Sequence, residues 1–241
     1  MKTTKPFQFT KGVILYPLGL VLCIWFVFWV EFHFDLNLKS YGIFPRKLDG
    51  LPGILVSPFL HGSLSHLYNN TLPLLVLSMA LSYFYKNLAF RIFYLGVIYS
   101  GILTWCIGSP AYHIGASGYI YVLMSFLLFK GLFSNHYRLI ALSLLVVFLY
   151  GGMIWYIFPI KENMSWEGHL SGFFVGLWFA VRFQSAVPKP EQYHWEKSDY
   201  NEQNDPFLKH FDAEGNFIEK PGESRESISE TAVKYFYNSE E

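Results

Sequence analysis

The sequence predicts an all-α membrane protein that has six transmembrane helices and a cytoplasmic C-terminal tail. Hydrophobic residues make up 52% of its 241 residues and charged residues only 15%. The mean hydropathy of +0.27 is positive, and long apolar runs recur between residues 12 and 185. A composition this apolar is typical of membrane proteins. Runs of this length favour helices, which satisfy their own backbone hydrogen bonds within lipid.

Charge divides the chain into two parts, although the formal net charge is zero. Residues 1–188 contain 12 Lys and Arg against 5 Asp and Glu, whereas residues 189–241 contain 6 against 13. We expect a cytoplasmic N-terminus over residues 1–11, a membrane domain over 12–185, and an acidic, largely disordered cytoplasmic tail over 186–241. The basic residues flank apolar runs instead of forming a patch, which disfavours nucleic acid as a partner.

Six apolar runs approach the length of about 20 helical residues that crosses a bilayer. A signal peptide would have a shorter apolar region and a small-residue cleavage site, so the first run is expected to be an uncleaved span. The fourth and sixth runs are short, and each is expected to begin below the outer surface of the bilayer. The expected spans are residues 12–30, 67–85, 90–107, 115–129, 139–158 and 168–181.

Residues 31–66 form a connection of unusual length for a compact membrane core. The segment F-P-R-K-L-D-G-L-P-G within it contains Pro and Gly residues that indicate turns. The connection is also rich in Phe, Leu and Ile, so we expect part of it to lie in the membrane interface. Connections of this length tend to be functional.

The distribution of basic residues predicts the orientation in the membrane. An even number of spans places both termini on one side, and cytoplasmic loops carry an excess of Lys and Arg. Eight basic residues fall on the side of the termini: Lys2, Lys5, Lys11, Lys86, Arg91, Lys130, Arg138 and Arg182. Four fall on the other side: Lys39, Arg46, Lys47 and Lys161. Both termini are therefore expected in the cytoplasm, and the compact core without a transit sequence favours a bacterial inner membrane.

A serine flanked by glycines opens the fourth run, where Ser117 lies between Gly115 and Gly118. Small residues let transmembrane helices approach closely, so helix packing is one explanation of this segment. However, His66 and His169 lie at the starts of two other spans, on the same side of the membrane. Ionisable side chains at membrane depth are costly and are usually functional, so these three helices are expected to share one polar site.

Acyl transfer is the chemistry that these residues favour. The start of a helix favours negative charge, and Ser117 is placed where an oxyanion would develop during attack on a carbonyl. His169 is the natural base for the serine hydroxyl. Gly172 and Gly176 share a helix face with His169 and permit close approach to the fourth helix, where Tyr121 lies one turn after the serine.

A carboxylate that would complete a catalytic triad is not found within the spans. Glu167 is the nearest acid, but two positions from His169 it points to another helix face. The acids of the core are Glu31, Asp35, Asp49, Glu162 and Glu167. A serine–histidine dyad is therefore favoured over a triad.

Further polar groups come from H-G-S-L-S-H-L-Y-N-N before and within the second span. His66 and Asn70 share a helix face and can direct donors at the site, whereas His61 is expected to make structural hydrogen bonds. The H-E-x-x-H motif of zinc metalloproteases is not present. A metal site formed by His61, His66 and His113 is the less favoured alternative.

Together these motifs resemble those of the rhomboid intramembrane serine proteases. The H-x-x-x-x-H-x-x-x-N, G-x-S-G and H-x-x-G-x-x-x-G motifs match in the family's order, on the second, fourth and sixth spans. The matching residues are His61, His66, Asn70, Gly115, Ser117, Gly118, Tyr121, His169, Gly172 and Gly176. The Trp-Arg pair that some bacterial members have in the first outer loop is not found, and Arg46 is the nearest feature.

The resemblance implies a six-helix rhomboid bundle in which Ser117 is the nucleophile and His169 the base. It also implies an oxyanion hole formed by His66, Asn70 and the Ser117 amide, with no metal or cofactor. The expected partners are the lipid bilayer and transmembrane substrates, which are cleaved near the outer face and enter past the fifth span. One alternative is a catalytically inactive rhomboid-like protein that binds membrane clients. Another is a small-solute transporter, although no internal repeat is visible.

Overall fold

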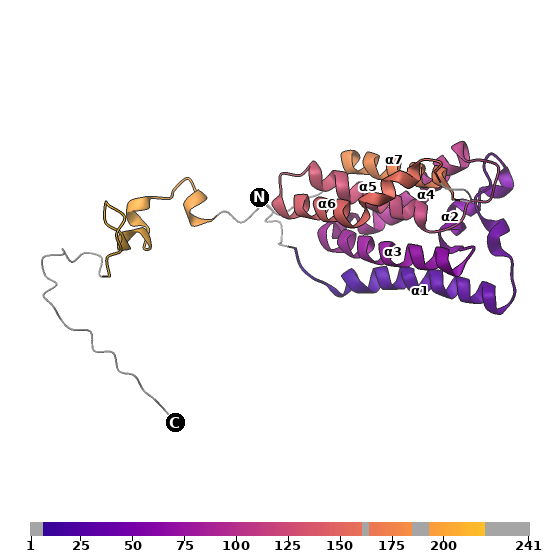
Figure 1. Cartoon of the computed structure of the whole chain (residues 1–241), viewed down its shortest axis with the longest axis horizontal. Coiled ribbons are helices and arrows are strands. Elements are labelled where there is room, and N and C mark those ends of the chain that lie inside the picture. The colour runs from indigo at the N-terminus through magenta and orange to yellow at the C-terminus, as the bar shows by residue number, and fades with distance from the viewer. Residues whose placement is uncertain (1–6, 161–163, 185–192, 220–241) are drawn as a thin grey trace, which may run out of the picture. The chain divides into compact units, whose positions relative to one another are not determined.

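The computed structural model describes residues 7–160, 164–184 and 193–219 of the chain (Figure 1). The chain divides into two compact units, residues 1–190 and 191–241, which we describe separately. Within the described residues the first unit is helical, and its only β-type pairing is an isolated antiparallel bridge between Ile43 and His113. The all-α class predicted from the sequence is therefore confirmed.

Seven α-helices form the described part of the first unit, and short 3-10 helices connect some of them. The α-helices are α1 (Lys11–His33), α2 (Gly53–Val56), α3 (Leu64–Phe84), α4 (Lys86–Ile107), α5 (Ser117–Leu132), α6 (Tyr137–Tyr150) and α7 (Trp166–Arg182). The 3-10 helices are η1 (Leu38–Tyr41), η2 (Leu48–Gly50), η3 (Ser57–Phe59) and η4 (Gly151–Ile157). The fifth expected span thus ends as an α-helix at Tyr150, where the Gly151-Gly152 pair disfavours a further α-helical turn.

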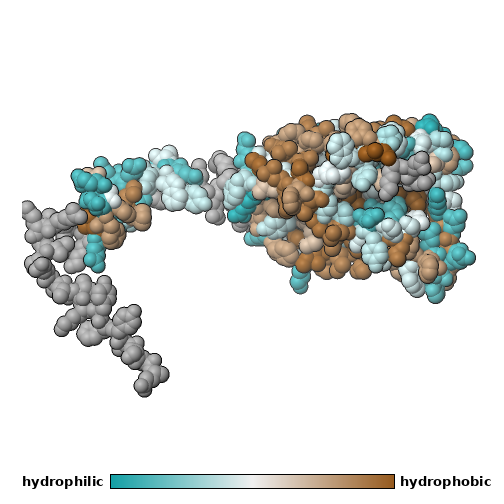
Figure 2. All heavy atoms as spheres, in the orientation of Figure 1, coloured by the Kyte–Doolittle hydropathy of each residue, from teal (hydrophilic) through white to brown (hydrophobic). Residues whose placement is uncertain are grey.

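Three segments of the described chain are long and apolar enough to cross a membrane: α1, α4, and α6 together with η4. Helix α3 has comparable length but carries polar residues such as His66 and Asn70, which lower its hydropathy. Large apolar side chains are exposed on the outside of the bundle, for example Phe148, which is 84% exposed. Figure 2 shows such residues gathered over the middle of the bundle, with hydrophilic ones towards its ends. This distribution is typical of a lipid-facing surface.

Helix α5 lies at the centre of the bundle. Every residue from Tyr119 to Leu127 is buried, as expected for a helix that is apolar on all sides. It contacts α3, α4, α6 and α7, and its interface with α7 is the most extensive between any two of the described helices. That interface is close because a Cβ on Gly172 would lie only 2.1 Å from the Gly118 carbonyl oxygen. The helices that carry Ser117 and His169 are therefore held nearly in backbone contact.

The long first connection contains short helical segments that are docked on the end of α4. The Arg46 guanidinium donates hydrogen bonds to the carbonyl oxygens of Gly108 (2.7 Å) and Cys106 (3.3 Å). The Trp105 indole N–H donates to the carbonyl of Lys47 (2.9 Å). A cation at the C-terminal end of a helix pairs with carbonyls that the helix leaves unbonded. Arg46 therefore fixes this connection to α4.

The described part of the second unit, residues 193–219, contains three short 3-10 helices: η5 (His194–Glu196), η6 (Glu202–Asn204) and η7 (Leu208–His210). An antiparallel bridge pairs Phe211 with Phe217 across a turn. The Asp212 carboxylate accepts the backbone N–H groups of Glu214 and Asn216 within this turn. Local side-chain hydrogen bonds of this kind stabilise turns without a large core.

Candidate active site

Ser117 is the first residue of α5, and its position follows from the backbone before it. The Gly115 N–H donates to the Ser57 carbonyl (2.8 Å), and the first helical bond runs from the Ile120 N–H to the Ala116 carbonyl (3.0 Å). The amides of residues 117–119 therefore have no carbonyl partner within the helix. These N–H groups and the positive end of the helix dipole favour a negatively charged oxygen beside Ser117.

His66 and Asn70 lie against the backbone immediately before Ser117. Gly115 has a φ of +109°, a conformation that residues with a side chain rarely adopt. A Cβ at this position would lie 2.6 Å from the His66 Nε2 atom and 3.7 Å from the Asn70 Nδ2 atom. Asn70 Nδ2 donates one hydrogen bond to the His66 carbonyl (3.0 Å). Because a side-chain amide has two N–H donors, the second remains available.

His61 lies in the connection before α3, outside the spanning helices. Its Nδ1 donates to the Phe59 carbonyl (3.4 Å), and its Nε2 accepts a hydrogen bond from the Ala116 N–H (3.5 Å). Burial, with a smaller effect from the adjacent His66, lowers the pKa of His61 to about 4. The imidazole is therefore neutral near pH 7, as its acceptor role requires. This contact ties the start of α3 to the residue before Ser117.

Two contacts fix the orientation of the His169 imidazole. Its Nδ1 lies 2.8 Å from the Tyr156 carbonyl oxygen of η4. A carbonyl only accepts hydrogen bonds, so Nδ1 carries the proton and Nε2 has a free lone pair in the neutral ring. The ring also stacks on Tyr121, with centroids 4.4 Å apart and planes inclined by 13°. The Tyr121 hydroxyl donates to the Met153 carbonyl (2.7 Å), which holds this second ring in place.

Glycines bring the serine and histidine helices together around these groups. Gly118, next to the serine, lies against the Gly168 carbonyl, and Gly172 lies against the Gly118 carbonyl. Gly176 continues the contact one turn later, since its Cβ would lie 2.4 Å from the Val122 carbonyl oxygen. Among the described residues no hydrogen bond joins Ser117 to His169. Hydrogen bonds between catalytic groups are often long before a substrate binds.

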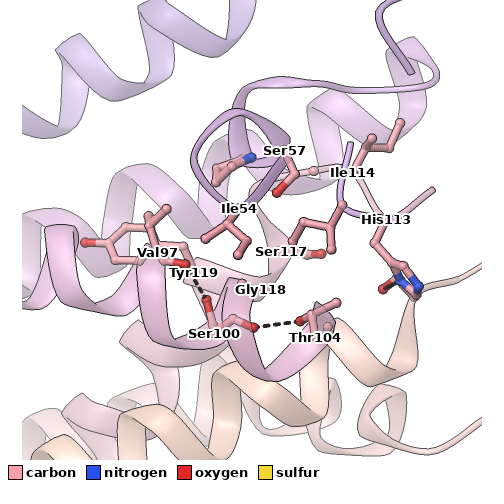
Figure 3. Close-up of a pocket in the computed structure, with 16 residues that line it drawn as sticks. Ile54, Ser57, Val97, Ser100, Thr104, His113, Ile114, Ser117, Gly118 and Tyr119 are labelled. Carbon is pink, nitrogen blue, oxygen red and sulfur yellow. Dashed lines mark hydrogen bonds between the residues drawn. The ribbon is translucent and has the colours of Figure 1, made fainter. Parts of the chain in front are cut away.

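A small polar cavity adjoins Ser117 between the first connection, α4, α5 and the start of α7. Its volume is about 30 Å³, and a water molecule needs at least about 10–15 Å³. Figure 3 shows Ser117 between His113 on one side and Val97 with Tyr119 on the other. The polar side chains that line it are those of Ser57, Ser100, Thr104, His113, Ser117, Tyr119 and Ser165. Such a cavity is suited to hold water beside the serine.

Metal binding is not favoured by the histidines that the sequence suggested for it. Both ring nitrogens of His113 lie near oxygen atoms, of Ser165 and Ser109, and those of His61 have the partners described above. A metal would have to displace these hydrogen bonds. In the part of the chain that the structure describes, no group of three His, Cys, Asp or Glu side chains is arranged to hold a metal ion.

Sequence reasoning missed two elements of the site. The carbonyl of Tyr156 orients His169, but a backbone acceptor leaves no trace in residue type. The second is the hydrogen-bond partner of Glu167, whose carboxylate accepts the Ser109 N–H (2.9 Å) just after the end of α4. The burial of this acid, only 4% exposed, was not evident from its place before an apolar run.

Comparison with known proteins places the chain in a family. The family model described as the Rhomboid domain matches residues 50–185, more than half of the chain. The protein is a member of the rhomboid family. Together with the apolar helices, this membership makes it an integral membrane protein with a rhomboid helical bundle. Rhomboid proteins are in general intramembrane serine proteases.

Similar proteins occur in mycobacteria. Relatives from Mycobacterium bovis and Mycobacterium tuberculosis are each 39% identical over 152 residues, which is 58% of this rhomboid chain and 62% of the relative. A relative from Mycobacterium leprae is 35% identical over 150 residues, 58% of this chain and 59% of that protein. The matched region thus spans less than two thirds of these relatives, and each is named as an uncharacterized protein.

Proposed function

We propose that this rhomboid protein is an intramembrane serine endopeptidase that uses Ser117 and His169 as a catalytic dyad. The observation that carries the proposal is the hydrogen bond from His169 Nδ1 to the Tyr156 carbonyl (2.8 Å). It leaves Nε2 unprotonated, as a general base requires, on the helix that packs closest to α5. Ser117 lies at the start of α5, where helix-end amides favour an oxyanion.

The chemistry proceeds in two steps through an acyl-enzyme. His169 Nε2 takes the Ser117 hydroxyl proton as the oxygen attacks the scissile carbonyl, and the same imidazole then protonates the leaving amine. Water from the adjoining cavity then attacks the acyl-serine while His169 Nε2 takes its proton, and the imidazole returns that proton to the Ser117 oxygen as the C–O bond breaks and the carboxylic acid leaves. His66, the free N–H of the Asn70 amide, and the Ser117 amide stabilise the oxyanion of each tetrahedral intermediate.

The proposal includes the topology. Helices α1, α3, α4, α5, α6 with η4, and α7 are the six spans, and both termini lie in the cytoplasm of a bacterial cell. Ser117 is then near the outer face, because α5 begins on the side opposite the termini. The substrates are transmembrane proteins, whose helices must unwind locally to expose a peptide bond. Entry past α6 is consistent with its exposed apolar surface.

The test is cleavage of a labelled single-span substrate by the protein reconstituted in liposomes. We expect cleavage by the wild type and at least a roughly thousandfold loss in Ser117→Ala and in His169→Ala, as for other serine–histidine pairs. A serine-directed fluorophosphonate should label the wild type and neither variant. Binding of the substrate without cleavage by the wild type would instead support the client-binding alternative, and unchanged cleavage by Ser117→Ala would reject the assigned nucleophile.

A further inference from the structure

A second set of polar groups, of which His113 and Glu167 are buried, lies beside the dyad but has no part in the chemistry proposed above. The set consists of Ser109 and His113, in the connection between α4 and α5, and of Ser165 and Glu167, at the start of α7. His113 is 6% exposed and Glu167 is 4% exposed. Buried ionisable groups are costly unless they are hydrogen-bonded, so the partners of these two side chains matter.

Two hydrogen-bonded arms join the α4–α5 connection to α7. In the first, the Ser109 N–H donates to the Glu167 carboxylate (2.9 Å). In the second, His113 Nδ1 lies 2.5 Å from the Ser165 hydroxyl oxygen. His113 Nε2 lies 3.1 Å from the Ser109 carbonyl oxygen, which connects the two arms. Because that carbonyl only accepts, Nε2 carries the proton, and in the neutral ring Nδ1 accepts from the Ser165 hydroxyl.

The position of the His113 ring depends on the absence of a side chain at Gly108. A Cβ on Gly108 would lie 2.8 Å from His113 Nε2, so the ring lies directly over this glycine at the end of α4. The His113 backbone also pairs with Ile43, through N–H···O bonds of 3.0 Å and 2.9 Å. The α4–α5 connection is thereby held between the first connection, at Ile43, and α7, and has little freedom to shift.

The two hydrogen-bonded arms, which we call the clasp, adjoin the two catalytic residues. His113 precedes Ser117 by four residues, and Glu167 precedes His169 by two. We propose that Glu167 and His113 are positioning residues: with Ser109 and Ser165 they lock the first turn of α7 to the segment that leads into α5, and so set the spacing of Ser117 and His169. The inference rests on the proposed dyad, and it explains why a buried carboxylate lies near the histidine without contacting it.

The full chain in liposomes allows a direct test, with kcat and KM measured separately, the fluorophosphonate labelling rate, and the unfolding temperature. Glu167→Ala removes the acceptor for the Ser109 N–H, whereas Glu167→Gln keeps an acceptor oxygen. Since a misplacement of about 1 Å costs roughly a hundredfold in rate, we expect Glu167→Ala to lower kcat and labelling at least about tenfold, with little change in KM. Glu167→Gln should restore most of the loss.

Ser165→Ala tests the second arm by deleting a single hydroxyl, and it carries the test if Glu167→Ala does not fold. We expect a fall in kcat here too, and a combined loss in Ser165→Ala with His113→Ala that is smaller than the product of the two single losses, because the two residues share one contact. The matched control is Ser125→Ala, which removes a different α5–α7 hydrogen bond, to the Phe173 carbonyl (2.7 Å). It should leave kcat near the wild-type value.

The outcomes separate this inference from the proposed function. Wild-type kcat in Glu167→Ala and Ser165→Ala, with Ser117→Ala inactive, overturns the clasp and leaves the dyad intact. An equal loss of kcat in Ser125→Ala also overturns it, because general weakening of the α5–α7 interface would then explain the data. A wild-type protein that neither cleaves nor labels overturns the proposed function, and the clasp with it.

Discussion

The distance between α5 and α7 is expected to control activity, and Gly172→Ala perturbs it directly. The added Cβ would lie 2.1 Å from the Gly118 carbonyl oxygen and 2.9 Å from the Tyr121 Cβ. Real Cβ contacts below 3.0 Å essentially do not occur, so the oxygen must retreat by about 0.9 Å. It belongs to the backbone of a buried helix, so the whole of α5 or α7 must shift.

Such a shift has consequences for stability and for rate. Overpacking of a tight interface costs about 1–3 kcal/mol. A displacement near 1 Å between reacting groups costs roughly a hundredfold in rate. We therefore expect Gly172→Ala to unfold at a lower temperature, and to lose between about tenfold and a hundredfold in kcat. Liposome cleavage assays and thermal unfolding in detergent measure the two effects.

The matched control is Gly19→Ala in α1, where nothing lies within 4 Å of the added Cβ. This variant makes the same chemical change within a helix and should keep wild-type activity and stability. Gly172→Ala with unchanged kcat and unfolding temperature would refute the argument that backbone contact between α5 and α7 sets the geometry of the dyad. A loss of similar size in Gly19→Ala would also refute it.

Two further predictions concern the residues around Ser117. Gly115→Ala adds a Cβ at a positive φ and 2.6 Å from His66. Cleavage should therefore fall at least about tenfold, and the backbone strain should cost about 1–3 kcal/mol of stability. The control is Gly215→Ala, at φ +83° in open space, which should leave cleavage unchanged; equal losses in both variants would contradict the role of His66. Burial lowers the pKa of His61 from 6.5 to about 4. The unfolded chain therefore binds a proton at a higher pH than the folded protein does. As a result, about 3 kcal/mol of stability that is present above pH 6.5 is lost as the pH falls to 4. Unfolding temperatures between pH 7.5 and 4.5 should therefore fall more steeply for the wild type than for His61→Gln, and parallel curves would contradict this assignment.

Much of the helical architecture could be predicted from the sequence, because apolar runs bounded by charges and turns mark helices directly. The expected run at 90–107 corresponds to α4, which begins at Lys86, and the run at 115–129 corresponds to α5, which begins at Ser117. The first connection was less predictable. Its turn-rich sequence did not indicate that Arg46 would bind carbonyls at the end of α4, since that contact joins residues 62 positions apart.

In the candidate site, too, local features could be predicted from the sequence and long-range contacts could not. The spacing of His169, Gly172 and Gly176 predicts a shared helix face, because that relation is local. The hydrogen bond of His169 to Tyr156 depends on where η4 places one carbonyl, and any residue type supplies a carbonyl. Glu167 is a second example. Helical spacing excluded it as a partner of His169, but only the tertiary structure identifies Ser109 as its partner.

The segment η4 supplies both carbonyls that hold the aromatic pair of the site, Met153 for Tyr121 and Tyr156 for His169. This segment continues directly from α6, the helix past which substrates are proposed to enter. An outward movement of α6 that carried η4 with it would break the hydrogen bond between His169 and the Tyr156 carbonyl, and the His169 ring would then be free to rotate. If the proposed function holds, the protein would be inactive while α6 is displaced, and cleavage would resume only after α6 returns.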